Sequence, residues 1–276
     1  MHARSDVTHV AFCHACFDRV IRAAVAVTSA LLVLFITIPL ATLYAHVAPA
    51  RFAATIASPA ALAALRISLV TTAVSLAITL ALGTPLAYAL ARGRFPGRGL
   101  VDALVDLPIV VPPAVAGLAL LFAFGRYGVT APVLDALHAR IAFTTFAVVF
   151  AQVFVGAPFF VRAARAGFTS VDRVYEEASA TLGMGPLRTF ARVTVPLALP
   201  ALAGGAVLAW ARALGEFGAT IMFAGNLQGV TQTMPLAVYL GLESGDLDLA
   251  AALAVVLVTV AVAVVVAARV LERRAA

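Results

Sequence analysis

Residues 166–196 read AGFTSVDRVYEEASATLGMGPLRTFARVTVP, a polar stretch that carries several arginines and lies between two apolar blocks. The blocks span residues 141–164 and 197–224, and each is longer than 20 residues. A helix of about 20 apolar residues crosses the ~30 Å hydrocarbon core of a bilayer. The stretch therefore predicts a folded loop that joins two membrane-spanning helices and lies outside the bilayer.

The first half of this loop has the pattern of a short amphipathic helix over residues 170–182. Ser170 is a suitable N-cap, and Asp172 places a carboxylate in the first turn, where it stabilises a helix. Apolar residues with helical spacing form one face, namely Val171, Val174, Tyr175, Ala178 and Leu182. Gly183 is expected to end this helix, and Pro186 is expected to open a second short helix.

Two locations suit such an amphipathic helix. It could lie on the inner leaflet of the membrane, but helices of that kind favour Lys and Arg on the polar face. This one carries Glu176 and Glu177 instead. The composition therefore favours a helix that docks into a groove on a partner protein.

The composition of the chain is that of a membrane protein. Hydrophobic residues make up 63% of it and charged residues only 12%, against roughly 25% charged in soluble domains, and the mean hydropathy is +1.05. Further apolar blocks lie at residues 21–47, 65–91, 101–124 and 249–270. Because lipid-exposed backbone is satisfied only in helices or closed barrels, and these blocks are too long for barrel strands, we expect an all-α polytopic fold of six transmembrane helices. The expected organisation is a tail at 1–19, a transmembrane domain at 20–270 with a loop at 166–196, and a tail at 271–276.

The arginines indicate the orientation, because cytoplasmic loops of membrane proteins are enriched in positive residues. Fourteen arginines fall on the side of the two termini: Arg4, Arg19, Arg22, Arg92, Arg94, Arg98, Arg162, Arg165, Arg173, Arg188, Arg192, Arg269, Arg273 and Arg274. Four fall on the other side: Arg51, Arg66, Arg126 and Arg140. This distribution predicts that both termini and the loop at 166–196 are cytoplasmic.

Several functions are excluded or disfavoured by residue content. All 19 positive residues are arginines, so the P-loop lysine that binds ATP phosphates cannot be present. The arginines do not cluster on one face, which argues against nucleic-acid binding. No H-E-x-x-H motif and no acid–base pair lies within a span, so we expect no catalytic site, no metal site and no cofactor. The C-x-x-C pair, Cys13 and Cys16, is weak support for zinc, and an unstructured tail is the favoured interpretation.

The loop resembles the coupling element of type I ABC importer permeases, whose EAA–G–I-x-L-P signature docks into an ATPase subunit. Glu177 and Ala178 match the first two letters, Ser179 replaces the second alanine, and Gly183 matches the glycine. Val193 and Val195 stand for the two aliphatic positions before Pro196. The resemblance implies that Glu176, Glu177, Ala178, Ser179, Gly183 and Pro196 contact the ATPase.

The segment from Arg212, RALGEFGATIMFAGN, resembles permeases for tetrahedral oxyanions, and its continuation is most similar to molybdate permeases. Tungstate and sulfate or thiosulfate permeases of the same family remain the alternative. The resemblance implies a homodimer in a bacterial inner membrane, with two ATP-binding subunits and an extracytoplasmic oxyanion-binding protein. A self-sufficient channel or proton-coupled carrier is disfavoured, because it would need a relay of intramembrane acids or histidines.

Four residues near the end of the fifth span are candidates for the pathway or its gate. Arg212 and Glu216 are spaced to form an ion pair along one helix face, with Arg212 able to face the anion transiently. Thr220 and Asn226 offer neutral hydrogen bonds near the outer end. In the same span, small residues recur at every fourth position, which predicts a close packing face: Ala201, Gly205, Ala209 and Ala213.

Overall fold

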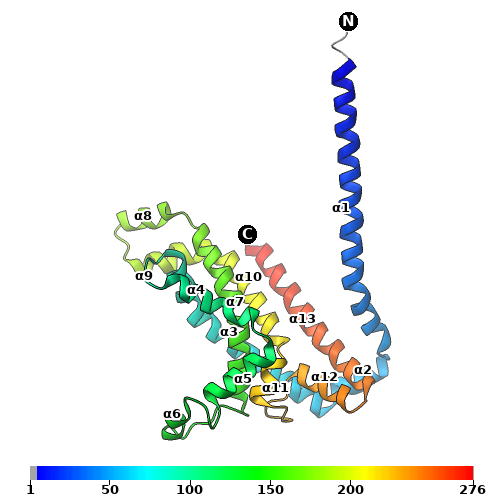
Figure 1. Ribbon diagram of the computed structural model, residues 1–276, viewed down its shortest axis with the longest axis vertical. Coiled ribbons are helices and arrows are strands. Elements are labelled where there is room, and N and C mark those ends of the chain that lie inside the picture. Colours follow the sequence, from blue (N-terminus) through cyan, green and yellow to red (C-terminus); the bar gives the residue numbers. More distant parts are fainter. Residues whose placement is uncertain (1–4, 276) are drawn as a thin grey trace. The chain divides into compact units, whose positions relative to one another are not determined.

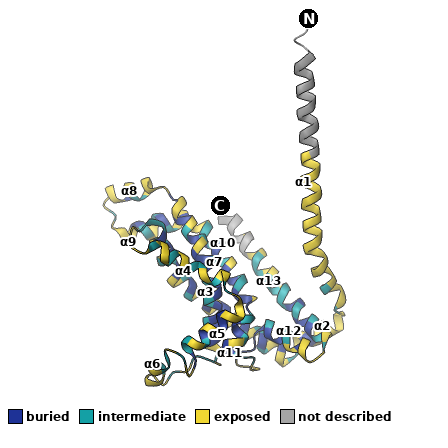
Figure 2. Ribbon diagram, viewed as in Figure 1, coloured by how far each residue is buried: buried dark blue, intermediate teal, exposed yellow. Residues whose placement is uncertain are grey.

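The computed structural model describes residues 5–275, and the side chains of residues 21–267 and 270 among them. The chain divides into two units, residues 1–49 and 50–276. The first unit contains a long helix, α1 (Ser5–His46), which begins well before the expected span, so the tail that we predicted to be unstructured is helical from Ser5 onward. Its described side chains are almost all exposed (Figure 2). The side chains of Cys13 and Cys16 lie outside the described residues.

The second unit contains the remaining helices (Figure 1). They are α2 (Pro49–Ala57), α3 (Pro59–Arg92), α4 (Arg98–Val110), α5 (Pro113–Phe124), α6 (Ala131–Ala136), α7 (Thr145–Ser170), α8 (Arg173–Thr181), α9 (Pro186–Thr189), the π-helix η1 (Phe190–Thr194), α10 (Val195–Leu214), α11 (Gly218–Ala224), α12 (Met234–Glu243) and α13 (Leu247–Ala275). No strand occurs among the described residues, so the predicted all-α class is correct.

Five helical segments of the described residues are long and apolar enough to cross a membrane, and a sixth span results if the bent pair α4 and α5 counts as one. We expected one span over residues 101–124, but the chain bends by 119° between α4 and α5. Pro112 and Pro113 explain the break, because proline removes a backbone donor and clashes with the preceding helical turn.

The expected span at residues 197–224 also differs from the structure. Helical structure begins earlier, at Pro186, and runs through η1 into α10 as far as Leu214. The chain then breaks over three residues before α11 begins at Gly218. The start of α11 packs against the start of α5, since a Cβ atom at Gly218 would lie 2.7 Å from the Cβ atom of Pro113.

The core of the second unit is built by α3, α7 and α10. Phe160 and Phe168 of α7 are fully buried beside Leu90 of α3. The small residues of α10 face α7, since a Cβ atom at Gly205 would lie 2.7 Å from the Cβ atom of Ala163. The predicted packing face is thus confirmed, and it allows the two helix backbones to approach closely.

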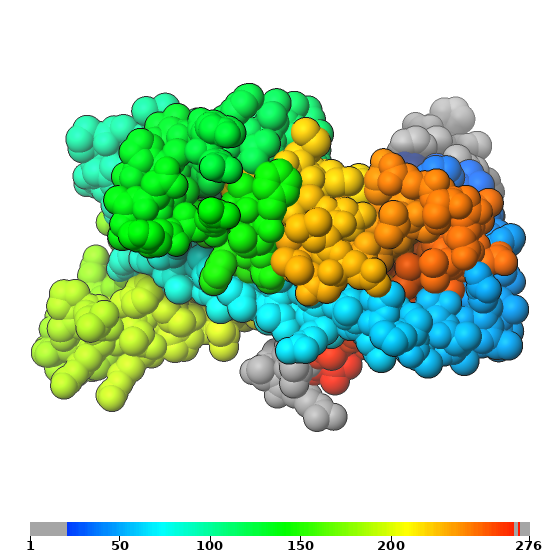
Figure 3. All heavy atoms as spheres, turned by 90° about the horizontal axis from the view of Figure 1, so that it is seen from below, coloured from blue at the N-terminus to red at the C-terminus, as the bar shows by residue number. Residues whose placement is uncertain are grey.

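The two ends of the second unit are built differently. At one end α8 and α9 project beyond α7 and α10, whereas α6 and α12 lie at the opposite end (Figure 1). There α12 lies along the N-terminal part of α3 (Figure 3), where the hydroxyl of Ser68 accepts a hydrogen bond from the backbone nitrogen of Met234 at 2.8 Å. The polar loop of the sequence therefore occupies one end of the helical bundle.

Candidate functional site

The short helix α8 begins and ends with specific capping contacts. Asp172, and not Ser170, is the N-cap, and its carboxylate accepts a hydrogen bond from the Val174 nitrogen at 3.0 Å. Ser170 instead belongs to the last turn of α7. Gly183 follows α8 with φ of +79°, a conformation that favours glycine. As predicted, Pro186 then opens the next helix.

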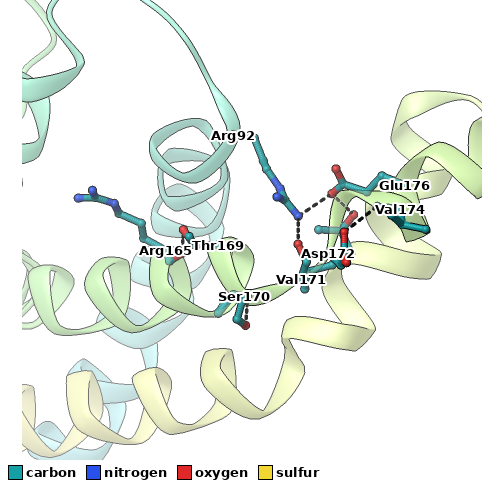
Figure 4. Close-up of polar contacts among 10 residues, drawn as sticks. Arg92, Arg165, Thr169, Ser170, Val171, Asp172, Val174 and Glu176 are labelled. Atoms are coloured by element: carbon teal, nitrogen blue, oxygen red, sulfur yellow. Dashed lines mark hydrogen bonds and ion pairs between the residues drawn. The ribbon is translucent and has the colours of Figure 1, made fainter.

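Glu176 points toward the bundle and joins three elements (Figure 4). Its Oε1 atom lies 3.4 Å from Nη2 of Arg92, at the end of α3. The hydroxyl of Thr194, in η1, donates to the same oxygen at 2.8 Å. Arg92 also donates to the backbone oxygen of Val171 at 2.6 Å. Because only 13% of the Arg92 side chain and 20% of the Glu176 side chain are exposed, solvent screens this ion pair only partly.

The side chain of Ser179 likewise points inward, toward another part of the same chain. Its hydroxyl lies 2.8 Å from the hydroxyl of Thr189 in α9, and both residues are buried. This hydrogen bond closes the turn between α8 and α9. Sequence reasoning missed Arg92, Thr189 and Thr194 as partners, because nothing in their spacing indicates which loop residues turn inward.

One exposed face of α8 is apolar. The side chains of Val174, Tyr175 and Leu182 are 61%, 56% and 83% exposed, and Ala178 is exposed between them. Val171, which we placed on the same face, is instead buried at the end of α7. Leu187 of α9 adds a further side chain with 80% exposure. We call Val174, Tyr175, Ala178, Leu182 and Leu187 the α8–α9 patch.

Two other residues of the signature, Glu177 and Pro196, lie at the surface. Glu177 is exposed and borders a shallow pocket of about 310 Å³ that is lined by Arg92, Arg173, Glu176, Glu177 and Ala180. Pro196 is exposed in the first turn of α10. The residues predicted to contact the ATPase thus include two that fix the loop, Glu176 and Ser179, and others that are exposed.

Ion pairs attach the base of this loop to α4. Arg165 of α7 pairs with Asp102, and Arg162 pairs with Asp106 at 3.6 Å. A signal for these contacts existed in the sequence, because each pair of like charges recurs with helical spacing on its own segment. They connect the helix before α8 to the bent pair α4 and α5.

Arg212, Glu216 and Thr220 lie at or next to the break between α10 and α11, whereas Asn226 lies in the loop after α11. Nη2 of Arg212 lies 2.7 Å from Oε2 of Glu216, so the predicted pair forms. Only 1% of the Glu216 side chain is exposed, and its Oε1 atom accepts a hydrogen bond from the Ala219 nitrogen at 2.8 Å. Glu216 therefore neutralises Arg212 and holds the first turn of α11.

The two neutral candidates differ in their surroundings. The Thr220 hydroxyl is fully buried and has no hydrogen-bond partner among the described residues. Asn226 is engaged on both sides of its amide: it donates to the Leu236 oxygen at 3.3 Å and accepts from Gln232 at 3.0 Å. These contacts fix the loop before α12. No group of three or more His, Cys, Asp or Glu residues that could hold a metal ion occurs within the described residues.

Comparison with known proteins assigns the chain to a family. Residues 83–276 match the family described as binding-protein-dependent transport system inner membrane component. The chain belongs to this family. It is 44% identical over 208 residues to the molybdenum transport system permease protein ModB of Mycobacterium tuberculosis strain H37Rv, covering 75% of this chain and 79% of the relative. It is 42% identical over 154 residues to ModB of Escherichia coli K12, covering 55% of this chain and 67% of the relative.

Solved structures share the fold at lower identity. A chain of a bacterial ABC transporter that imports the acidic polysaccharide alginate superposes with a TM-score of 0.75 and 18% identity, covering 95% of this chain and 98% of that one. A chain of the inward-facing MetNI methionine ABC transporter gives a TM-score of 0.56 and 18% identity, covering 79% of this chain and 94% of that one. The fold is therefore that of ABC importer permeases, as the sequence predicted.

Proposed function

We propose that this chain is the membrane-spanning subunit of an ATP-driven importer for molybdate. It works as a homodimer with two ATP-binding subunits on the cytoplasmic side and an extracytoplasmic oxyanion-binding protein on the other. Family membership makes it a permease subunit, and the 44% identity to mycobacterial ModB is the observation that supports molybdate as its substrate.

The α8–α9 patch supports the proposed contact with the ATPase. An apolar surface whose large side chains are more than half exposed is unfavourable in water, and it is typical of an interface. Its scaffold is fixed from behind by the Glu176 and Ser179 contacts. A displacement of the patch by a partner would therefore be transmitted to α3 and to η1 rather than being absorbed by a mobile loop.

In the proposed cycle, closure of the two ATP-binding subunits moves the two α8–α9 patches together and opens the bundle to the receptor side. Arg212, Glu216, Thr220 and Asn226 are proposed to lie along the pathway or at its gate. The orientation in the cycle follows from the arginine distribution, with both termini and α8 on the cytoplasmic side.

Reconstitution tests this proposal. The chain is co-expressed with its ATP-binding subunit, placed in proteoliposomes with ATP on the ATPase side, and supplied with the receptor protein loaded with molybdate. We expect molybdate accumulation that requires all three proteins and ATP. Accumulation by the isolated chain, or a complete system that hydrolyses ATP without moving any oxyanion, would contradict the proposal.

Sulfate is the second candidate substrate, since the chain is 41% identical over 143 residues to a probable sulfate permease, cysT, of Helicosporidium, covering 51% of this chain and 53% of the relative. The same proteoliposomes distinguish the candidates when tungstate and sulfate replace molybdate. Preferential uptake of sulfate would retain the importer assignment and change the substrate.

A further inference from the structure

The partners in the Arg212–Glu216 pair are held very differently. Glu216 is 1% exposed, and its Oε1 atom is fixed by the Ala219 nitrogen at 2.8 Å. Its Oε2 atom lies 2.7 Å from Nη2 of Arg212, yet the two do not form an aligned hydrogen bond. Arg212 keeps 30% of its side chain exposed. One carboxylate oxygen is thus anchored to the backbone, whereas the other forms the ion pair with the guanidinium.

The pair lies where two broken helices meet. Arg212 is in the last turn of α10 and Glu216 is in the break before α11. The break contacts the start of α5, since a Cβ atom at Gly218 would lie 2.7 Å from the Cβ atom of Pro113 and 3.3 Å from the Ala114 nitrogen. Broken helices occur at membrane depth where the backbone is buried in protein or lines a cavity. Charged residues at such a position mark functional sites.

The guanidinium of Arg212 can bind either the carboxylate of Glu216 or an oxyanion. A guanidinium presents planar donors that match a carboxylate and a tetrahedral oxyanion equally well. An unpaired arginine in a region of low dielectric would hold a divalent oxyanion tightly and slow its release. A fixed carboxylate beside it provides a competing anion that limits this affinity.

We propose that Arg212 is an oxyanion-binding residue of the pathway and that Glu216 is its built-in competitor. The oxyanion passing through the pathway binds the guanidinium in place of the Glu216 carboxylate, while Glu216 keeps its hydrogen bond to Ala219. When the oxyanion leaves, the carboxylate pairs with Arg212 again. This exchange rests on the proposed import of an oxyanion, and it assigns a binding role to a pair that would otherwise only stabilise the helix break.

Binding of radiolabelled molybdate to the purified complex with the ATP-binding subunit, in detergent and without the receptor protein, tests the exchange. Glu216→Gln removes the competing charge but keeps an oxygen for the Ala219 nitrogen, so we expect affinity to rise by about tenfold or more. The double variant Arg212→Gln with Glu216→Gln should lose this gain. An unchanged affinity in the single variant, or a gain that persists without Arg212, would overturn the proposal.

A measurement on the unmodified chain covers the case in which Glu216→Gln does not fold. Phenylglyoxal modifies accessible arginines, and peptide mass analysis reports each site. Molybdate should slow the modification of Arg212 and leave that of Arg66, which is exposed on α3, unchanged. Equal labelling of Arg212 with and without molybdate would contradict the exchange. Receptor-dependent uptake by the wild-type complex tests the import function separately, so the two failures are distinguishable.

Discussion

Glu176 of α8 places one carboxylate oxygen 3.4 Å from the guanidinium of Arg92, the last residue of α3, and the same oxygen accepts from Thr194 at 2.8 Å. Along the chain, Glu176 is 84 residues from Arg92 and 18 residues from Thr194. A force applied to α8 therefore acts at once on the C-terminal end of α3 and on the segment that leads into α10.

The charge of Glu176 can be removed while its hydrogen bond to Thr194 is kept, as in Glu176→Gln. Losing a partly buried, charge-assisted contact costs about 1–3 kcal/mol, so we expect molybdate uptake per ATP hydrolysed to fall. Arg92→Gln should have a similar effect, and the double variant should be little worse than either single one. Additive losses in this cycle would show that the two residues act independently.

Reversing the charge of Glu177 tests the outward side of α8. Because Glu177 is exposed and Glu176 turns inward, Glu177→Arg should weaken co-purification of the ATP-binding subunit and leave the thermal stability of the chain unchanged. Glu243→Arg is a matched control, since Glu243 is also an exposed glutamate but ends α12 at the opposite end of the unit. Normal assembly and uptake by Glu177→Arg would remove this residue from the proposed interface.

Gly183 and Gly185 allow a backbone test within one turn. Gly183 has φ of +79° and Gly185 has φ of −69°, and a Cβ atom at either would meet nothing within 4 Å. An alanine in the left-handed conformation costs about 1–2 kcal/mol. Gly183→Ala should thus impair assembly with the ATP-binding subunit, whereas Gly185→Ala should not. Equal behaviour of the two variants would show that the turn conformation is unimportant.

Adjacent glycines of α10 test the packing against α7. A Cβ atom at Gly205 would lie 2.7 Å from that of Ala163, whereas one at Gly204 would meet nothing within 4 Å. Overpacking of this kind typically costs about 1–3 kcal/mol. Gly205→Ala should lower the melting temperature in detergent, and Gly204→Ala should leave it unchanged or raise it. Equal melting temperatures of the two variants would contradict the prediction.

The features that could be predicted from sequence are those with a local or periodic cause. Apolar length and the absence of barrel-like alternation gave the all-α class, and the small residues around Gly205 gave the packing face of α10. The 119° bend between α4 and α5 could not be predicted from Pro112 and Pro113, because proline indicates a break but not the size of the bend. The early end of α10 at Leu214 was missed for a related reason: Gly215 and Gly218 are tolerated inside many membrane helices, and only the structure shows the close approach of Gly218 to Pro113.

The loop at residues 166–196 shows a second limit of prediction from sequence. Helical spacing placed Val174, Tyr175 and Leu182 on one face correctly, and all three are exposed. Spacing alone could not show that Glu176 turns toward Arg92, which is distant in sequence and has no periodic relation to it. Contacts between charged residues on different segments require the fold, and the Arg165–Asp102 pair shows that complementary spacing on two segments is the best available hint.

The hydroxyl of Ser179 is buried against that of Thr189. The serine that departs from the EAA signature is therefore hidden from anything that contacts α8 from outside. An ATP-binding subunit that evolved beside a permease with alanine at this position would meet the same outer surface here. A serine or an alanine at this position should consequently leave that contact unchanged, because the side chain affects only the packing of α8 against α9.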